Sequence, residues 1–238
     1  MNPLLSRLAA APTLSLLIFS AAAVAAQTAP RTFAISHSSL CVTEGEIGNG
    51  PNDSLIVDAQ KMRAYVNAWT AQSIDAEFTY IGPTAKESAL GSGEIRRQFG
   101  LKLRAQDACN LVYAMWRIEP ESKLVVSIKR NPGQARSSEC GNRGYQNIKP
   151  RRASPVPALH PGDKHALRAQ MDGDNLSVFV DNRPVWEGSV GPDAAALTGP
   201  VGIRSDNARL QLDLRAGVLS GVHPNYALTC KSGPDASD

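Results

Sequence analysis

Residues 165–188, HALRAQMDGDNLSVFVDNRPVWEG, contain the pattern that decides the fold. Apolar and polar residues alternate in three short runs, as they do in β-strands that bury one face. Two segments rich in Asp, Asn and Gly, residues 172–175 and 181–184, separate the runs. These residue types tolerate the positive φ angles that tight hairpin turns require. The stretch therefore predicts three consecutive antiparallel strands joined by two tight turns.

The same alternation extends through most of the chain on both sides of this stretch. It recurs in residues 73–82, 94–107, 110–120, 123–132 and 208–217, and only residues 58–69 remain ambiguous between helix and strand. Many short strands separated by turns are typical of an all-β sandwich. A proline-rich connector over residues 141–163 interrupts the pattern without changing it on either side. We therefore expect a single β-sandwich domain over residues 27–238.

The first 26 residues have the features of a secretory signal peptide. Arg7 precedes an apolar run over residues 14–24, and Ala-Val-Ala at 23–25 has the small residues of a cleavage site. The apolar run is shorter than the ~20 residues that span a bilayer. We expect the mature chain to begin near Gln27 and to be secreted or periplasmic, with no membrane insertion after the signal is removed.

All four cysteines lie in the predicted mature chain. Because an exported protein enters an oxidising compartment, two disulfides are expected rather than a metal site, and no Cys or His spacing indicates zinc. Four cysteines allow three pairings. The expected one joins Cys41 to Cys230, which would tie the two ends of the domain together, and Cys109 to Cys140.

Two motifs near the C-terminus resemble those of a known fold family. Val178-Phe179-Val180-Asp181-Asn182 and the segment GPVGIRSDN at residues 199–207 are similar to the closing strands of concanavalin A-like lectin/glucanase domains. The resemblance is greatest to the laminin-G-like and 3-keto-disaccharide-hydrolase-like branch, and it covers about a quarter of the mature chain. It implies a jelly roll of two curved antiparallel sheets, in which the concave face commonly holds glycans.

Positive charge is concentrated in the middle of the chain. Residues 94–152 contain 13 Lys and Arg against 5 Asp and Glu, a net charge of +8 in a chain whose total is +3. A local field of this kind concentrates anions. If these strands lie in the concave sheet, side chains of one parity would line its groove. The candidate ligand-binding residues are Arg96, Gln98, Lys102, Arg104, Tyr113, Arg117 and Lys129.

These observations predict a protein that binds a poly- or oligosaccharide, expected to be acidic, without a cofactor or metal. Export and the scarcity of aromatic residues argue against nucleic acid. An enzyme on the same fold, a polysaccharide lyase or a hydrolase of modified disaccharides, is the alternative, and its catalytic residues are unknown. The sequence lacks the paired carboxylates of a glucanase, since Glu119 and Glu121 flank a proline in an expected turn. A structural envelope protein is the third hypothesis.

Overall fold

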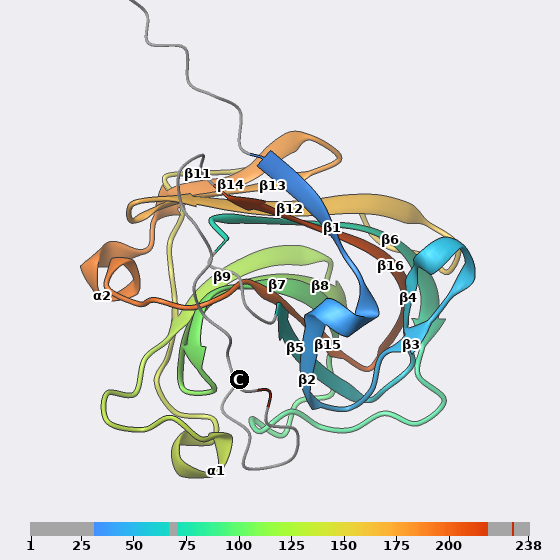
Figure 1. Cartoon of the computed structure of the whole chain (residues 1–238), viewed down its shortest axis with the longest axis horizontal. Helices are drawn as coiled ribbons and strands as arrows, with labels where there is room; N and C mark the ends of the chain where they lie inside the picture. Colours follow the sequence, from blue (N-terminus) through green and yellow to red (C-terminus); the bar gives the residue numbers. More distant parts are fainter. Residues whose placement is uncertain (1–30, 67–70, 219–229, 231–238) are drawn as a thin grey trace, which may run out of the picture.

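The computed structural model describes residues 31–66, 71–218 and 230, and within them the chain forms two antiparallel sheets (Figure 1). The nine-stranded sheet consists of β1 (Arg31–Ile35), β3 (Gly48–Asn49), β4 (Leu55–Val57), β6 (Ser73–Pro83), β11 (Arg152–Ala153), β12 (Lys164–Asp172), β13 (Asn175–Val180), β14 (Arg183–Ser189) and β16 (Ala208–Val218). The seven-stranded sheet consists of β2 (Leu40–Glu44), β5 (Lys61–Val66), β7 (Arg97–Asp107), β8 (Asn110–Glu119), β9 (Lys123–Lys129), β10 (Tyr145–Asn147) and β15 (Gly202–Asp206). The predicted all-β, two-sheet antiparallel sandwich is confirmed.

Helices in the described residues are short. Two α-helices, α1 (Ser137–Cys140) and α2 (Gly191–Ala195), and two 3-10 turns, η1 (His37–Ser39) and η2 (Pro51–Asp53), connect the strands. None of the described helices has the length and apolar character that crossing a membrane requires. The predicted signal peptide, residues 1–26, lies outside the described residues.

The hairpins that residues 165–188 predicted are confirmed. Strands β12 and β13 pair in antiparallel register, and β13 pairs with β14. The turns contain positive φ angles at Gly173, Asp181 and Asn182, of 60°, 50° and 62°. Asp and Asn adopt this conformation more readily than other residues with a side chain. The ambiguous segment at residues 58–69 contains strand β5, and residues 67–70 lie outside the description.

The core lies between the two sheets and consists of one face of each. Phe78 on β6 contacts Phe99 on β7 and Trp116 on β8, with ring centroids 5.2 and 5.7 Å apart. Phe99 and Trp116 are completely buried. A buried aromatic side chain of this size contributes about 1.5–3 kcal/mol of hydrophobic stabilisation, so contacts of this kind hold the sheets together.

Both expected disulfides are present. Cys41 on β2 joins Cys230, and Cys109 joins Cys140 at the end of α1. The first connects residues that are 189 apart in the sequence, and the second closes a loop across 31. The second disulfide fastens the segment between β9 and β10 against the start of β8, next to the site described below.

Candidate functional site

The seven-stranded sheet has a second face, turned away from the core, that carries mostly polar side chains. On β7, Phe99 and Leu101 point into the core, whereas the alternate residues Gln98, Gly100 and Lys102 belong to the other face. A small apolar cluster that includes Tyr113 and Met115 lies apart from the main core. In Figure 1, strands β9, β8 and β7 arch over this face. We call it the outer face of the seven-stranded sheet.

Two adjoining cavities, of about 700 Å³ and 220 Å³, open on the outer face. Tyr113, Tyr145 and Arg204 line both and mark the boundary between them. The charged residues that line one or both cavities are six cations and two acids: Lys61, Arg63, Arg96, Arg117, Lys129 and Arg204, with Glu44 and Glu94. The larger cavity falls within the 300–1,000 Å³ range of ordinary ligand sites.

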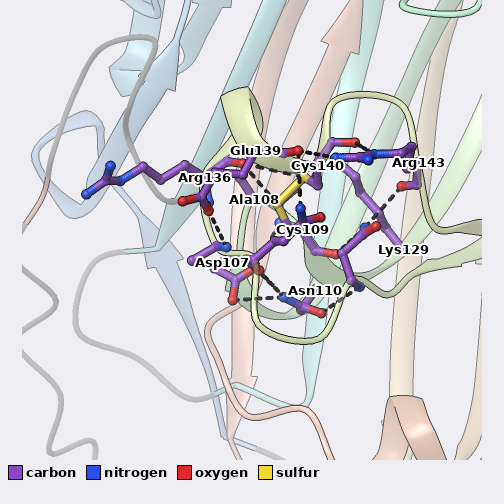
Figure 2. The surroundings of a disulfide bond; sticks show 12 residues. Asp107, Ala108, Cys109, Asn110, Lys129, Arg136, Glu139, Cys140 and Arg143 are labelled. Atoms are coloured by element: carbon purple, nitrogen blue, oxygen red, sulfur yellow. Dashed lines mark hydrogen bonds between the residues drawn. A yellow bond between two sulfur atoms is a disulfide. The ribbon is translucent and has the colours of Figure 1, made fainter.

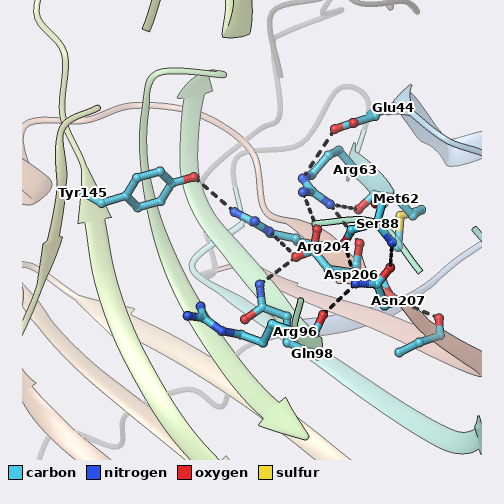
Figure 3. Close-up of polar contacts among 12 residues, drawn as sticks. Glu44, Met62, Arg63, Ser88, Arg96, Gln98, Tyr145, Arg204, Asp206 and Asn207 are labelled. Carbon is cyan, nitrogen blue, oxygen red and sulfur yellow. Dashed lines mark hydrogen bonds and ion pairs between the residues drawn. The ribbon is translucent and has the colours of Figure 1, made fainter. Parts of the chain in front are cut away.

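A buried carboxylate organises the arginines of this face (Figure 3). Asp206 is fully buried, and its Oδ1 accepts a hydrogen bond from Arg63 Nη2 at 2.6 Å. Its Oδ2 accepts hydrogen bonds from Gln98 Nε2 at 2.7 Å and Arg204 Nε at 2.9 Å. Burial alone would raise the pKa of Asp206, but Arg63 and Arg204 outweigh it and lower the pKa well below its usual range.

The same balance operates at Arg204. Burial would lower the pKa of this guanidinium, but Asp206 and the neighbouring tyrosines outweigh burial and raise the pKa. The cluster is therefore a charged network at neutral pH, with one carboxylate serving two guanidinium groups.

The two arginines differ in how many of their donors remain available. Arg63 Nη1 donates hydrogen bonds to the carbonyls of Met62 and Ser205, both at 2.9 Å. Its Nη2 donates to Asp206, and its Nε lies 3.7 Å from the carboxylate of Glu44. Arg204 gives Nε to Asp206 and Nη1 to the Tyr145 hydroxyl at 3.1 Å. Since a guanidinium has five N–H groups, Arg204 keeps donors that no other described residue uses. Arg63 is mainly a structural cation.

Gly100 allows β8 to lie close to β7 beside Arg204. It lies opposite Arg204 in the register of β7 and β15 and has no side chain. A Cβ atom at this position would collide with the carbonyl oxygen of Ala114 on β8. The Arg204 guanidinium lies over the ring of Tyr113, 5.2 Å from its centroid. This cation–π contact fixes the guanidinium at the boundary between the cavities.

Tyr145, on edge strand β10, completes an aromatic pair above the sheet. Its ring stacks on that of Tyr113, with centroids 6.0 Å apart and planes inclined by 24°, and Lys129 Nζ lies 5.2 Å from its centroid. Burial would raise the pKa of the Tyr145 phenol, but the positive charges of Arg204 and Lys129 outweigh it and lower the pKa. At a given pH a larger fraction of Tyr145 is therefore phenolate, the form that can accept a proton, than of an ordinary tyrosine.

The segment between β9 and β10 forms one wall of the larger cavity, and Figure 2 shows the disulfide that links this segment to Cys109. It carries Ser137, Ser138 and Asn142 to the cavity lining, and the Cys109–Cys140 disulfide fastens it. Asn110 supplies further links: its Nδ2 donates to the Gln134 carbonyl at 2.8 Å, and its Oδ1 accepts the backbone N–H of Asn131 at 2.9 Å. These bonds hold the wall in place from β8.

The opposite wall is held by Asn207. Its φ of 55° places the side chain against residues 84–96, the segment that brings Leu90 and Gly91 to both cavities. The Asn207 amide accepts the backbone N–H of Ser88 at 2.9 Å and donates to the carbonyls of Ser88 and Arg96 at 2.9 and 3.0 Å (Figure 3). Two adjacent residues therefore hold different parts of the site. Asp206 holds the arginines of the outer face, and Asn207 holds one wall of the cavities.

Five of the seven predicted ligand residues line the two cavities of the outer face. Arg96, Gln98, Tyr113 and Arg117 line the smaller cavity, and Lys129 and Tyr113 line the larger one. Arg96 forms an ion pair with Glu94, and Gln98 supports Asp206. Lys129 Nζ donates to the Ala108 carbonyl at 2.9 Å. Trp116, the opposite-parity residue on β8, is buried in the core.

The other two predicted residues lie apart from the cavity linings. Lys102 is on the correct face but completely buried. Arg104 leaves the face because the register of β7 and β8 shifts between Leu103 and Asp107 and its own φ is 48°. Its guanidinium binds the carbonyls of Ala195 and Gly173 instead. A β-bulge re-aims side chains in this way, and the simple alternation of the sequence gave no sign of it.

Arg117 has an unusual environment. It lines the smaller cavity, and its Nε is buried with no hydrogen-bond partner in the described part of the chain. Burial and the nearby Arg96 both lower its pKa. An unsatisfied buried donor costs about 1–3 kcal/mol, so an anion bound beside Arg117 would remove this penalty.

The sequence reasoning did not identify Arg63, Arg204, Asp206 or Tyr145. Arg204 and Asp206 belong to the GPVGIRSDN segment, which we interpreted only as a fold motif. The Arg-x-Asp pattern in this segment places two opposite charges on the same face of one strand, and this pattern could have indicated the ion pair. Among the described residues, no group of three or more His, Cys, Asp and Glu side chains could hold a metal ion.

Comparisons with known proteins identify the architecture. No protein-family model matches the chain, and no curated protein matches it. Among solved structures, the carbohydrate-binding module CBM66 from Bacillus subtilis is similar with a TM-score of 0.51 and 13% identity, covering 73% of this chain and 91% of that one. The chain has the concanavalin A-like lectin/glucanase jelly-roll fold.

Two further similar structures were found. Apo Crh5 transglycosylase has a TM-score of 0.49 and 11% identity, covering 81% of this chain and 85% of its own. A Bacillus subtilis protein of unknown function with a galectin-like fold has a TM-score of 0.48 and 10% identity, covering 76% and 90%. With identities this low, the function must be argued from the residues of the outer face.

Proposed function

We propose that this protein binds an acidic carbohydrate in the two cavities of the outer face. The observation that carries the proposal is Arg204. Asp206 and Tyr145 hold its guanidinium between the cavities, and within the part of the chain that the structure describes its other donors have no partner. Charge-assisted hydrogen bonds from such a fixed guanidinium suit a carboxylate or sulfate group. The stacked Tyr113 and Tyr145 rings add apolar surface of the kind that packs against sugar rings.

Two other observations support this proposal. The lining carries six cations against two acids, which favours anions over neutral sugars. The similar structure with the highest TM-score among those described is named as a carbohydrate-binding module. The two disulfides agree with a secreted or periplasmic location, which we propose together with removal of residues 1–26.

Isothermal titration with short oligogalacturonates and a neutral oligosaccharide of equal length tests the proposal. We expect binding of the acidic ligand only. Arg204→Lys keeps the charge but loses the planar fork, and we expect roughly a 10- to 150-fold loss of affinity. Arg215→Ala, an exposed residue on the nine-stranded sheet, is the control. Equal affinity of wild type and Arg204→Lys, or of the acidic and neutral ligands, would refute the proposal.

An acid-polysaccharide lyase is the second candidate, and the lowered pKa of Tyr145 favours it. The Tyr145 phenolate would take the proton from the carbon next to the uronate carboxyl group. That electron pair would form a carbon–carbon double bond and expel the glycosidic oxygen, which takes up a proton from water. Arg204 would stabilise the charge that develops on the carboxylate.

The two candidates differ in whether the ligand is consumed. A lyase produces an unsaturated uronate with a new ultraviolet absorbance, whereas a binding protein leaves the polymer intact. If absorbance rises with wild type and the rise disappears in Tyr145→Phe, the protein is a lyase. If affinity is measurable and absorbance stays constant across a panel of polyuronates, it is a binding protein.

A further inference from the structure

A third cavity, of about 340 Å³, lies at the edge of the sandwich beside β9. Its lining includes Leu124 and Val126 of β9, Val185 and Trp186 of β14, and parts of the connector that links β10 to β11. It shares Arg117, Val125 and Asn147 with the smaller cavity of the outer face. The three cavities therefore form a continuous series across the seven-stranded sheet to its edge.

Arg117 stands where the second and third cavities meet. Its buried Nε lacks a hydrogen-bond partner among the described residues, although it is surrounded by the linings of both cavities. Lys123, which also lines the third cavity, forms an ion pair with Glu121. Positive side chains thus continue past the outer face instead of ending with it.

Residues 148–154, which follow β10 and include β11, carry three further cations, Lys149, Arg151 and Arg152. Their backbone is fixed on both sides, because the Ile148 N–H bonds to the Val126 carbonyl at 2.9 Å and the Arg151 N–H bonds to the Glu187 carbonyl at 2.7 Å. Lys149 and Arg151 are exposed and have no ion pair within the described residues. Arg152, in contrast, lies 3.3 Å from Glu187.

We infer that the ligand is a long polyanionic polysaccharide, which leaves the outer face past Arg117, crosses the third cavity and continues over Lys149 and Arg151. This inference rests on the proposed function and specifies its ligand class. One exposed cation contributes little by itself. A polymer with a charge on every sugar can contact several at once, and each added contact is made within a complex that already exists. Binding should therefore strengthen with chain length beyond what the two outer-face cavities accommodate.

The experiment compares short oligogalacturonates with polygalacturonate on wild type and on Lys149→Ala/Arg151→Ala. For the double variant we expect unchanged affinity for the short ligand and roughly a 2- to 30-fold loss for the polymer. The dependence of polymer affinity on salt concentration should also become less steep, because fewer ligand charges are neutralised. Both substituted side chains are exposed, so the fold should persist, and thermal melting checks this.

Lys164→Ala/Arg215→Ala is the matched control, since it removes two exposed positive charges from the nine-stranded sheet. We expect it to leave polymer affinity unchanged. Equal losses in both double variants would show that only net charge matters and would overturn the inference. Unchanged polymer affinity in Lys149→Ala/Arg151→Ala would do the same, while leaving intact a proposed function supported by the short ligand.

Single-stranded DNA is the remaining comparison. If it binds as tightly as polygalacturonate and loses affinity equally in Lys149→Ala/Arg151→Ala, the connector is a general polyanion surface, and the polysaccharide assignment is wrong. Much weaker binding of DNA under the same salt conditions supports it.

Discussion

Asp206 and Arg204, two residues apart on β15, form a buried ion pair with an Nε to Oδ2 distance of 2.9 Å. The pair orients the guanidinium. Arg204 Nε donates to the carboxylate, so the two Nη groups lie at the boundary of the two cavities. Gln98 and Arg63 bind the same carboxylate, so it is satisfied on all sides. The positive charge presented to a ligand therefore depends on one buried negative charge.

Asp206→Asn should destabilise the protein strongly. The substitution keeps the size of the side chain but leaves Arg204 without its counter-charge and Arg63 with only the more distant Glu44, 3.7 Å from its Nε. Removing one partner of such an arrangement costs about 3–5 kcal/mol. Urea denaturation at neutral pH measures the change, and Asp213→Asn, at an exposed position on β16, serves as the control. A loss no greater than that of the control would show that Asp206 is not the organising group.

Acid should remove the advantage of wild type over Asp206→Asn. The pKa of Asp206 is lowered in the folded protein relative to about 3.9 in an unfolded chain. Its contribution is therefore fully present above that unfolded value and is lost as the pH falls from there through the lowered folded value. Denaturation curves of both proteins between neutral and strongly acidic pH should converge as the pH falls. A constant difference would contradict the assignment.

Tyr145 should lose its proton at a lower pH than an ordinary tyrosine. Its pKa is lowered because Arg204 and Lys129 outweigh the effect of burial. In an alkaline titration followed by phenolate absorbance, the earliest of the five tyrosines should be absent from Tyr145→Phe. Arg204→Met should move that first transition to higher pH. If neither substitution changes the start of the titration, the contact between Tyr145 and Arg204 does not persist in solution.

Removing the Cys109–Cys140 disulfide should weaken ligand binding more than it disturbs the fold. Closing a loop across 31 residues stabilises by about 3–4 kcal/mol on the chain-entropy model. Without it, the wall that leads to Tyr145 on β10 is held mainly by hydrogen bonds from Asn110 and Asn131. Limited proteolysis of Cys109→Ser/Cys140→Ser should cut residues 130–144 first, with reduced affinity for oligogalacturonate. Cleavage elsewhere at equal rates would indicate that the disulfide stabilises the whole domain instead.

Arg104→Ala should destabilise the protein without changing ligand affinity. The guanidinium donates to the carbonyls of Ala195 and Gly173, away from the cavities. Loss of such charge-assisted bonds costs roughly 1–3 kcal/mol. Thermal melting measures the loss of stability, and titration with oligogalacturonate measures the affinity. The Arg204→Lys variant, measured in the same way, is the comparison. A fall in affinity comparable to that of Arg204→Lys would place Arg104 in the binding site after all.

The sequence by itself determined the strands, the hairpin turns and the sandwich. These features depend on local rules: alternation of apolar residues defines a buried face, and Asp, Asn and Gly accept the backbone angles of tight turns. The same parity argument placed Gln98 and Lys102 on one face of β7. It failed at Arg104, because one bulge changes the direction of every side chain that follows it.

Only the tertiary structure decided which charges meet. Arg63, Tyr145 and Arg204 come from separate parts of the chain, and strand pairing and a disulfide bring them to one surface. Whether a cation is free for a ligand depends on how many of its donors the protein already uses, as the contrast between Arg63 and Arg204 shows. The physical reason is that electrostatic and hydrogen-bond energies depend on distance and burial in three dimensions, whereas alternation along a strand depends only on neighbours in the sequence.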